Sequence, residues 1–232
     1  MKFNLFIVLT LIFSSCSSVT QRMDGFEIHG IDVSRYQSDI DWPKVATQDI
    51  SFAFVKASEG ETISDNFFCK NWKEIKEAGI RRGAYHFFRP TTSVLTQAQN
   101  FMDNVILEKG DLPPVLDVEV MDGVSSEELV KRVRIWLEII ETEYQIRPII
   151  YTNLKFYNKH FADHFPDYPV WIARYNQYLQ PLLVNNVDWK FWQYGNRGRL
   201  EGIQGDVDFN VFKGTIEELE SLCYNPQSLS LQ

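Results

Sequence analysis

The stretch Pro113-Pro114-Val115-Leu116-Asp117-Val118-Glu119-Val120 places two acidic residues inside an apolar, β-branched run. Such a run predicts a buried strand. A buried carboxylate is unfavourable unless it is paired, hydrogen-bonded or protonated. Residues i and i+2 of a strand point to the same face, so Asp117 and Glu119 are predicted to share one small volume. Two such carboxyls suit acid–base chemistry on a glycosidic bond, although a helix-capping Asp and a Glu paired with an interior Arg would also explain the pattern.

Seven similar β-rich runs occur along the chain, at residues 29–34, 52–57, 84–88, 149–152, 170–173, 191–194 and 207–209. Helical patterns lie between the earlier runs and become short or absent between the last ones. They cover residues 67–78, 93–108, 125–144, 153–160 and 216–222. This alternation predicts one α/β domain, a modified TIM-like β/α barrel with eight strands and with helices short or missing between the last strands.

Polar side chains are predicted at the carboxyl end of nearly every one of these strands. One such residue would be a turn or a helix cap, but a polar group at almost every strand end indicates an active-site cleft, because barrel enzymes build their sites at this rim. The residues are Asp32, Glu59, His86, Asp117, Glu119, Tyr151, Asn153, Arg174, Tyr175, Gln193, Tyr194 and Asp208.

The composition limits the partners of the protein. The formal net charge of −8 argues against nucleic acid or an anionic membrane surface as a partner. The four histidines are scattered, and Cys69 and Cys223 have no neighbour at metal-ligand spacing, so we expect no metal and no cofactor. Whether these two cysteines pair stays open. We expect a monomer.

The first residues have the features of an export signal. Lys2 precedes an apolar stretch over 5–13, and Ser14-Ser15-Cys16 follows. This pattern is similar to a bacterial lipobox, although Phe13 stands where Leu is usual, and ordinary secretion is the alternative. We predict a lipoprotein-type signal over 1–15, lipidation of Cys16, a tether over 16–27, a catalytic domain over 28–224 and a tail over 225–232. The expected location is the cell envelope, facing the periplasm or on the outer-membrane surface.

An ordered series of motifs between residues 30 and 212 resembles the glycoside hydrolase family 25 lysozymes. Two positions depart from the family pattern, since Tyr36 replaces a common Trp and Ser58 a frequent Thr. The motifs are Gly30-Ile31-Asp32-Val33-Ser34-Arg35-Tyr36-Gln37, Phe52-Ala53-Phe54-Val55-Lys56-Ala57-Ser58-Glu59-Gly60, Gly83-Ala84-Tyr85-His86-Phe87-Phe88-Arg89-Pro90, Asp117-Val118-Glu119, Val170-Trp171-Ile172-Ala173, Trp192-Gln193-Tyr194 and Val207-Asp208-Phe209-Asn210.

The resemblance implies hydrolysis of the β-1,4 bond between N-acetylmuramic acid and N-acetylglucosamine, with peptidoglycan glycan strands as the partner. By match, Glu119 is the general acid. Asp117 is its partner, which orients the substrate acetamido group or stabilises positive charge. Asp32 and Asp208 match the two other acids of the family cleft. Retention or inversion at the sugar carbon stays open.

Six further rim residues are predicted to bind substrate: Tyr85, His86, Tyr151, Trp171, Arg174 and Gln193. For the aromatic residues, half-buried core packing is an equal alternative. His86 is expected to hydrogen-bond within the rim, and Arg174 to balance the acidic cleft or to meet Asp208. Lys56 and Glu59 are expected to pair behind the site.

Two other functions are compatible with the sequence. One is hydrolysis of another N-acetylated glycan such as chitin, although Pro113 and Pro114 stand where chitinases carry further spaced aspartates. The other is a non-catalytic peptidoglycan-binding lipoprotein, which the presence of all four acids disfavours.

Overall fold

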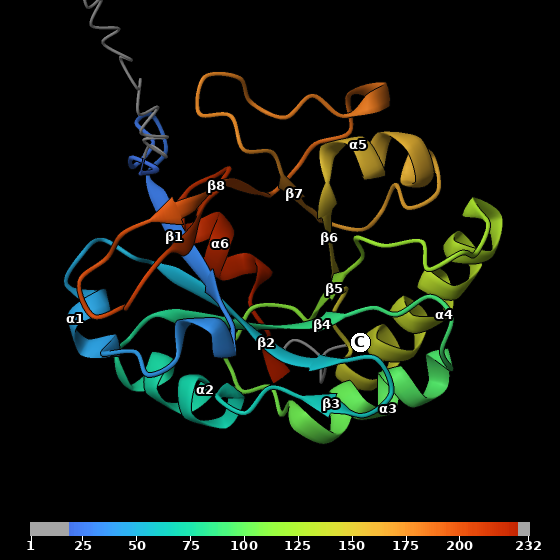
Figure 1. The fold of residues 1–232 in the computed structure, drawn as a ribbon, viewed down its shortest axis with the longest axis horizontal. Coiled ribbons are helices and arrows are strands. Elements are labelled where there is room, and N and C mark those ends of the chain that lie inside the picture. Colours follow the sequence, from blue (N-terminus) through green and yellow to red (C-terminus); the bar gives the residue numbers. More distant parts are fainter. Residues whose placement is uncertain (1–18, 227–232) are drawn as a thin grey trace, which may run out of the picture.

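The computed structural model describes residues 19–226 and confirms the predicted eight-stranded β/α barrel (Figure 1). The strands are β1 (Ile28–Val33), β2 (Phe52–Glu59), β3 (Ile63–Ser64), β4 (Arg81–Phe87), β5 (Val115–Asp117), β6 (Ile149–Asn153), β7 (Val170–Ala173), β8 (Phe191–Gly198) and β9 (Val207–Phe212). They pair in the order β1-β9-β8-β7-β6-β5-β4-β2, and pairing of β1 with β2 closes the barrel. Strand β3 is a short antiparallel extension beside β2.

Strand β9 runs antiparallel to both of its neighbours, β1 and β8, whereas the other barrel strands run parallel to one another. Asp208 therefore lies near the start of β9, and the prediction that it stands at the carboxyl end of its strand is wrong. Because β9 runs in the opposite direction, its start lies at the same rim as the carboxyl ends of the other strands. Asp208 reaches the predicted rim and pairs in register with Asp32.

Helices cover the outside of the barrel over its first two thirds (Figure 1). Between β7 and β8 there is only one 3-10 turn, and β8 and β9 are joined without a helix, as predicted. The helices are α1 (Trp42–Ala46), α2 (Phe68–Glu77), α3 (Val94–Asn104), α4 (Ser126–Tyr144), α5 (Leu154–Phe156) and α6 (Ile216–Leu222), with 3-10 turns η1 (Arg35–Gln37) and η3 (Val184–Asn186) and a π-helical turn η2 (Tyr157–Phe161).

Side-chain caps begin the helices where the sequence predicts them. The Ser125 hydroxyl accepts a hydrogen bond from the backbone N–H of Glu128, and the Asn153 side chain accepts one from Phe156. Helix α3 ends at Asn104, earlier than predicted, because Val105 takes an extended backbone conformation. Strands β4, β8 and β9 are longer than predicted, since β4 begins at Arg81, β8 ends at Gly198 and β9 ends at Phe212, and helix α1 was not predicted.

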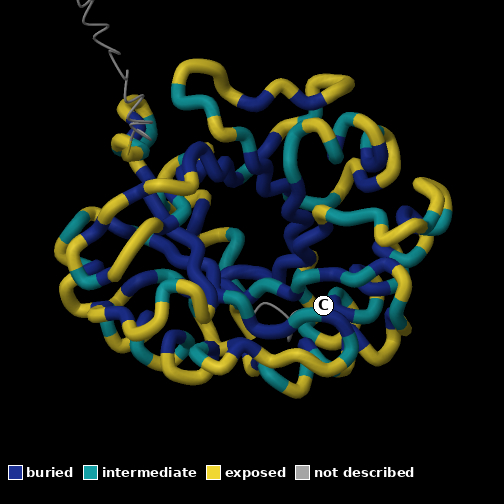
Figure 2. The backbone as a smooth tube through the Cα atoms, in the orientation of Figure 1, coloured by how far each residue is buried: buried dark blue, intermediate teal, exposed yellow. Residues whose placement is uncertain are grey.

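Aromatic side chains fill the barrel interior below the rim, within the buried ring of strands seen in Figure 2. The rings of Phe54 and Trp171 stack with centroids 4.4 Å apart. Room for these rings depends on glycine, since a Cβ at Gly30 would overlap the ring of Phe52 and one at Gly83 would overlap Phe54. This packed layer is the solid floor of the cleft above it.

The predicted signal over 1–15 and the predicted lipidation site Cys16 lie outside the described residues. Within residues 19–226, no helix has the length and apolar character needed to cross a membrane. Cys69 is exposed and Cys223 partly buried, and both are free thiols.

Candidate active site

A cleft of about 260 Å³ opens at the rim formed by the carboxyl ends of the parallel strands. The four predicted acids converge there, although they come from three strands that are far apart in the sequence. The lining residues are Asp32, Val33, Ser34, Tyr36, Gln37, Lys56, Tyr85, Phe87, Asp117, Glu119, Tyr151, Trp171, Tyr175, Gln193 and Asp208.

Asp117 ends β5 and Glu119 follows two residues later, and both side chains line the cleft. Val115 packs inside the barrel, whereas Leu116 and Val118 pack outward into the core beneath the helices. The alternate residues Asp117 and Glu119 therefore face inward. The backbone is fixed at this point, because the Asp117 carbonyl accepts a 2.9 Å hydrogen bond from Phe88 N–H on the β4 side.

Burial raises the pKa of both carboxyls of this pair. Desolvation raises the pKa of Asp117 well above its ordinary value, and the neighbouring charge of Glu119 raises it further. Desolvation also raises the pKa of Glu119, while a hydrogen bond with Asp117 opposes that rise. Both carboxyls therefore bind a proton more tightly than an exposed Asp or Glu would.

A second acid pair lies across the cleft, on β1 and β9. Asp32 Oδ2 accepts hydrogen bonds from the amide of Gln193 at 2.8 Å and from that of Asn210 at 2.7 Å. Burial raises the pKa of Asp32 to about 6 even against these donors. Burial, and then the charge of Asp32, raises the pKa of Asp208 to about 9. Asp208 therefore holds the proton of this pair at neutral pH.

Donors on strands β6 and β7 and on the β7–β8 loop fix the direction of the two amides. Gln193 Oε1 accepts hydrogen bonds from the hydroxyls of Tyr151 at 2.9 Å and Tyr175 at 3.1 Å. Asn210 Oδ1 accepts one from Trp171 Nε1 at 2.8 Å. With the oxygens occupied in this way, both NH₂ groups must point to Asp32. The predicted residues Tyr151, Trp171 and Gln193 therefore support the Asp32 carboxylate as well as the cleft wall.

The sequence prediction missed two residues of this arrangement. Asn210 belongs to the family motif of residues 207–210 but had no predicted role. Tyr175 was predicted only as a polar residue at a strand end. The i+2 spacing of Asn210 from Asp208 on one strand could have indicated it, since such residues share a face. No sequence signal marks Tyr175, because it lies in a loop whose path depends on tertiary packing.

His86 does not line the cleft, and its predicted role in binding substrate is not compatible with its position. Adjacent strand residues point to opposite faces, and Tyr85 takes the inner one. The ring of His86 is fully buried on the outer face, where Nδ1 lies 2.8 Å from the Ser58 hydroxyl and Nε2 lies 3.2 Å from Gln97 Oε1. It also stacks on Trp136. Burial lowers the pKa of His86 to about 4, so the ring is neutral.

Arg174 also lies apart from the acids. Its guanidinium donates a 2.7 Å hydrogen bond to the carbonyl of Gln180 in the β7–β8 loop, and it does not line the cleft. The expectation that Arg174 balances the acidic cleft or meets Asp208 is therefore wrong. The chain leaves the barrel after Ala173, so strand alternation no longer determines where this side chain points.

Lys56 supplies the positive charge in the cleft. Its ammonium lies 2.6 Å from Glu59 Oε2, which confirms the predicted pair, and Arg89 holds the other oxygen of Glu59 at 2.6 Å. Lys56 is the one basic residue among those described that line the cleft. Its charge lowers the pKa of both Asp117 and Glu119, against the effect of burial.

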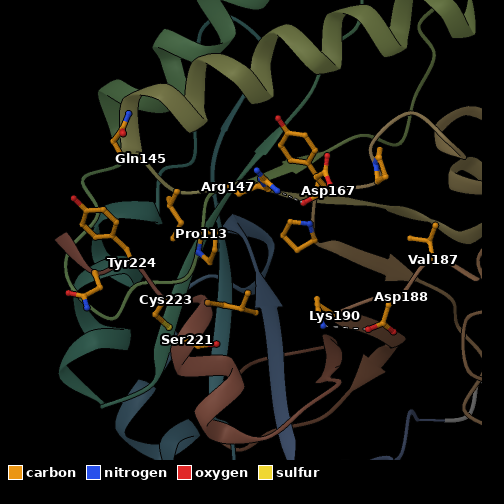
Figure 3. A pocket seen from close by; sticks show the side chains of 16 residues that line it. Pro113, Gln145, Arg147, Asp167, Val187, Asp188, Lys190, Ser221, Cys223 and Tyr224 are labelled. Carbon is orange, nitrogen blue, oxygen red and sulfur yellow. Dashed lines mark hydrogen bonds and ion pairs between the residues drawn. The ribbon is translucent and has the colours of Figure 1, made fainter. Parts of the chain in front are cut away.

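A larger hollow, of about 620 Å³, lies at the opposite end of the barrel, between the strand starts and α6 (Figure 3). Its charged groups are already engaged, since Lys190 pairs with Asp188 and Arg147 donates to the carbonyl of Asp167. In the part of the chain that the structure describes, no group of three or more His, Cys, Asp or Glu side chains is arranged to hold a metal ion. The acidic chemistry is therefore concentrated at the rim.

The chain is similar to known proteins over most of its length. The family described as glycosyl hydrolases family 25 matches residues 31–203. The uncharacterized protein YegX of Escherichia coli (strain K12) is 45% identical over 202 residues, which are 85% of this chain and 74% of YegX. Lysozyme M1 of Streptomyces globisporus is 34% identical over 87% of this chain and 73% of its own. The solved structure of a family 25 glycosyl hydrolase from Bacillus anthracis superposes with a TM-score of 0.83 at 37% identity, covering 89% of this chain and 98% of that one. This chain therefore belongs to family 25 of the glycoside hydrolases.

Proposed function

We propose that this enzyme is a lysozyme that hydrolyses the β-1,4 bond between N-acetylmuramic acid and N-acetylglucosamine in peptidoglycan. The observation that carries the proposal is the proton-holding pair Asp117 and Glu119, which faces a second acid pair across one cleft. The name of the relative lysozyme M1 and the family resemblance support the same substrate. Cleavage of a glycosidic bond needs an acid for the leaving oxygen and negative charge for the oxocarbenium-like state, and this cleft holds both.

Glu119 is the general acid in the proposed reaction. The proton that it shares with Asp117 passes from Glu119 to the glycosidic oxygen as the bond from that oxygen to the sugar carbon C1 breaks. Both carboxyls of the pair are then negatively charged and face the positive sugar. The raised pKa values of both carboxyls favour retention of this proton by the enzyme, which suits a general acid.

Asp117 holds the substrate acetamido group. Its Oδ1 is buried and has no hydrogen-bond partner among the described residues, which is unusual for a buried carboxyl oxygen. An acetamido N–H of the substrate would satisfy this oxygen and would turn the acetamido carbonyl toward C1. The carbonyl oxygen then bonds to C1 as the glycosidic bond breaks, and water attacks C1 in a second step while Glu119 takes its proton.

Asp32 and Asp208 complete the site as a hydrogen-bonded pair that carries one negative charge at neutral pH. The amides of Gln193 and Asn210 fix the Asp32 carboxylate, so its charge faces the developing positive charge without rearrangement. Tyr85, Tyr36 and Phe87 offer aromatic surface for sugar rings along the cleft.

The protein is an exported lipoprotein in this proposal, anchored through Cys16 after removal of residues 1–15. The lipobox-like sequence supports the anchor, and an enzyme of this family meets its polymer outside the cytoplasm. Residues 16–27 would then join the lipid to the catalytic domain over 28–224.

Analysis of the products tests the proposed bond. Purified peptidoglycan is digested, the new reducing ends are reduced with borohydride, and the fragments are identified by mass spectrometry. A muramidase leaves N-acetylmuramic acid at the reducing end. Reduced N-acetylglucosamine instead, or equal cleavage of chitin oligomers, would contradict the proposal and favour another N-acetylated glycan bond.

A further inference from the structure

The described chain begins beside the catalytic rim. The backbone N–H of Thr20 donates to the carbonyl of Arg197 at 2.9 Å, and Arg197 N–H donates to the Thr20 hydroxyl at 3.2 Å. Residues 195–198 form the carboxyl end of β8, which runs parallel to β7 toward the rim. Anything attached a few residues before Val19 is therefore held at the end of the barrel that carries the acids.

The β7–β8 loop lies next to this N-terminal segment. The Gln177 side chain donates a 2.6 Å hydrogen bond to the carbonyl of Gln21, and the two segments share a hollow of about 520 Å³. In Figure 1 the loop is orange and lies at the same side of the molecule as the blue N-terminal segment. Tyr175 lines both this hollow and the catalytic cleft, so the three features adjoin one another.

Exposed apolar side chains are concentrated in the N-terminal segment and the β7–β8 loop. Of ten large apolar side chains that are strongly exposed in the described residues, six lie here, with Tyr178 at 93% and Leu182 at 72% exposure. Residues 174–187 contain no Asp or Glu, although the chain as a whole carries a net charge of −8. The six are Val19, Tyr175, Tyr178, Leu179, Leu182 and Val184. An apolar cluster of this kind on a soluble domain indicates a contact surface.

We propose that this apolar surface, defined by the six side chains just named, rests on the lipid bilayer as a second membrane contact of the anchored enzyme. The inference rests on the proposed lipid anchor at Cys16. Only Ser17 and Ser18 lie between Cys16 and Val19, and the three Cα-to-Cα steps span at most about 11 Å, so the anchor would hold this face against the bilayer. A tyrosine and leucines without acidic neighbours suit the interfacial region, where the negative charge elsewhere on the protein would be repelled.

The orientation has a functional consequence. Because Tyr175 borders the cleft and belongs to the apolar surface, the cleft opens alongside the membrane and not away from it. The anchored enzyme would cut the glycan strands nearest to its membrane. Strands deeper in the wall would be out of reach of a tether this short.

Fluorescence quenching from within the bilayer tests the contact. The lipidated protein, made from the full chain, is reconstituted in phosphatidylcholine vesicles that contain acyl chains with nitroxide quenchers. One preparation carries an environment-sensitive fluorophore on Leu182→Cys with Cys69→Ser and Cys223→Ser. The matched control carries it on native Cys69, which is exposed on α2 away from the loop, with Cys223→Ser. We expect about a twofold or greater quenching at position 182 and little at position 69.

Further outcomes separate this inference from the proposals on which it rests. Tyr178→Ser with Leu179→Ser should reduce the quenching at position 182, while cleavage of soluble wall fragments stays unchanged. An anchored protein with an unquenched label at position 182 overturns the membrane contact and leaves the anchor intact. Mass spectrometry that finds no lipid on Cys16 overturns both. If the Tyr178→Ser, Leu179→Ser variant instead binds purified wall more weakly without vesicles, the surface binds glycan and the membrane contact is wrong.

Discussion

Asp32 on β1 and Asp208 on β9 are direct partners in the antiparallel pairing of the first and last strands of the barrel. They are far apart in the sequence, yet each affects the other, since the charge of Asp32 raises the pKa of Asp208 above its own. The site is therefore complete only when the first and last strands meet. Its acid–base behaviour depends on barrel closure as well as on the local motif of β5.

Asp208→Asn should make the folded protein more stable at alkaline pH. The pKa of Asp208 rises from 3.8 to about 9 on folding, so the folded state gives up stability as pH rises from about 4 toward 9. An Asn at this position donates to Asp32 without titrating. We expect a gain of about 1–2 kcal/mol in the free energy of unfolding at pH 8 and no gain at pH 4. Urea denaturation at both pH values measures it, with the exposed Asp167→Asn as control, and equal effects at the two pH values would contradict the assignment.

Glu119→Gln should abolish wall hydrolysis while the fold persists. The amide cannot deliver a proton to the glycosidic oxygen, and loss of one general acid lowers rates by about 10²–10⁴. Clearing of a wall suspension measures the rate, and circular dichroism checks the fold. Glu138→Gln, exposed on α4, is the matched control. Near wild-type clearing by the Glu119 variant would remove this residue from the mechanism.

Asp117→Ala should affect N-acetylated and N-deacetylated wall differently. If Asp117 Oδ1 binds the acetamido N–H, the wild-type enzyme cleaves N-acetylated wall faster, by about 10²-fold or more. The variant should be slow on both substrates, with most of this preference lost. Initial rates of release of reducing ends on matched substrates give the comparison. If the variant still cleaves N-acetylated wall faster than N-deacetylated wall, another group recognises the acetamido substituent.

His86 and Tyr85 should give opposite results, because they face opposite sides of β4. His86→Ala removes the contacts with Ser58, Gln97 and Trp136, so we expect a loss of about 2–4 kcal/mol in stability with kcat unchanged. Tyr85→Phe should keep stability and alter KM. The wild type should also lose stability as pH falls from 6.5 toward 4, since the folded ring resists protonation. A lower kcat for the His86 variant, measured on protein confirmed to be folded, would show that His86 contributes to catalysis.

Cys16→Ala should release the protein from membranes. If Cys16 is the lipidated first residue of the mature protein, the native form partitions into detergent and its N-terminus carries a lipid mass. The variant should carry no lipid and should appear in the soluble fraction. Mass spectrometry of the native N-terminus decides. A soluble native product that starts at another residue would mean ordinary secretion and would leave the catalytic proposals intact.

The sequence by itself determined the strands, the helix caps, the barrel and the two acids of β5. These follow from short-range rules. Alternation along one strand places Asp117 and Glu119 on one face, and the Ser125 and Asn153 caps are satisfied within one helical turn. The rim position of Asp32 also followed from its strand end, whereas Asp208 reaches the rim only because β9 runs antiparallel, which was not predicted.

Only the tertiary structure decided how these acids are supported. Tyr85 faces the cleft and His86 faces outward because of the way β4 is turned in the barrel. The sequence of β4 does not show which face turns inward, because residues on both faces are largely apolar. The amides of Gln193 and Asn210 meet Asp32 because strands β8, β9 and β1 are neighbours in the closed barrel. The direction of Arg174 and the position of Tyr175 depend on a loop that packs against the N-terminal segment, a contact between residues more than 150 positions apart. Local sequence patterns cannot predict such contacts, because they form only when segments far apart in the sequence meet in the folded barrel.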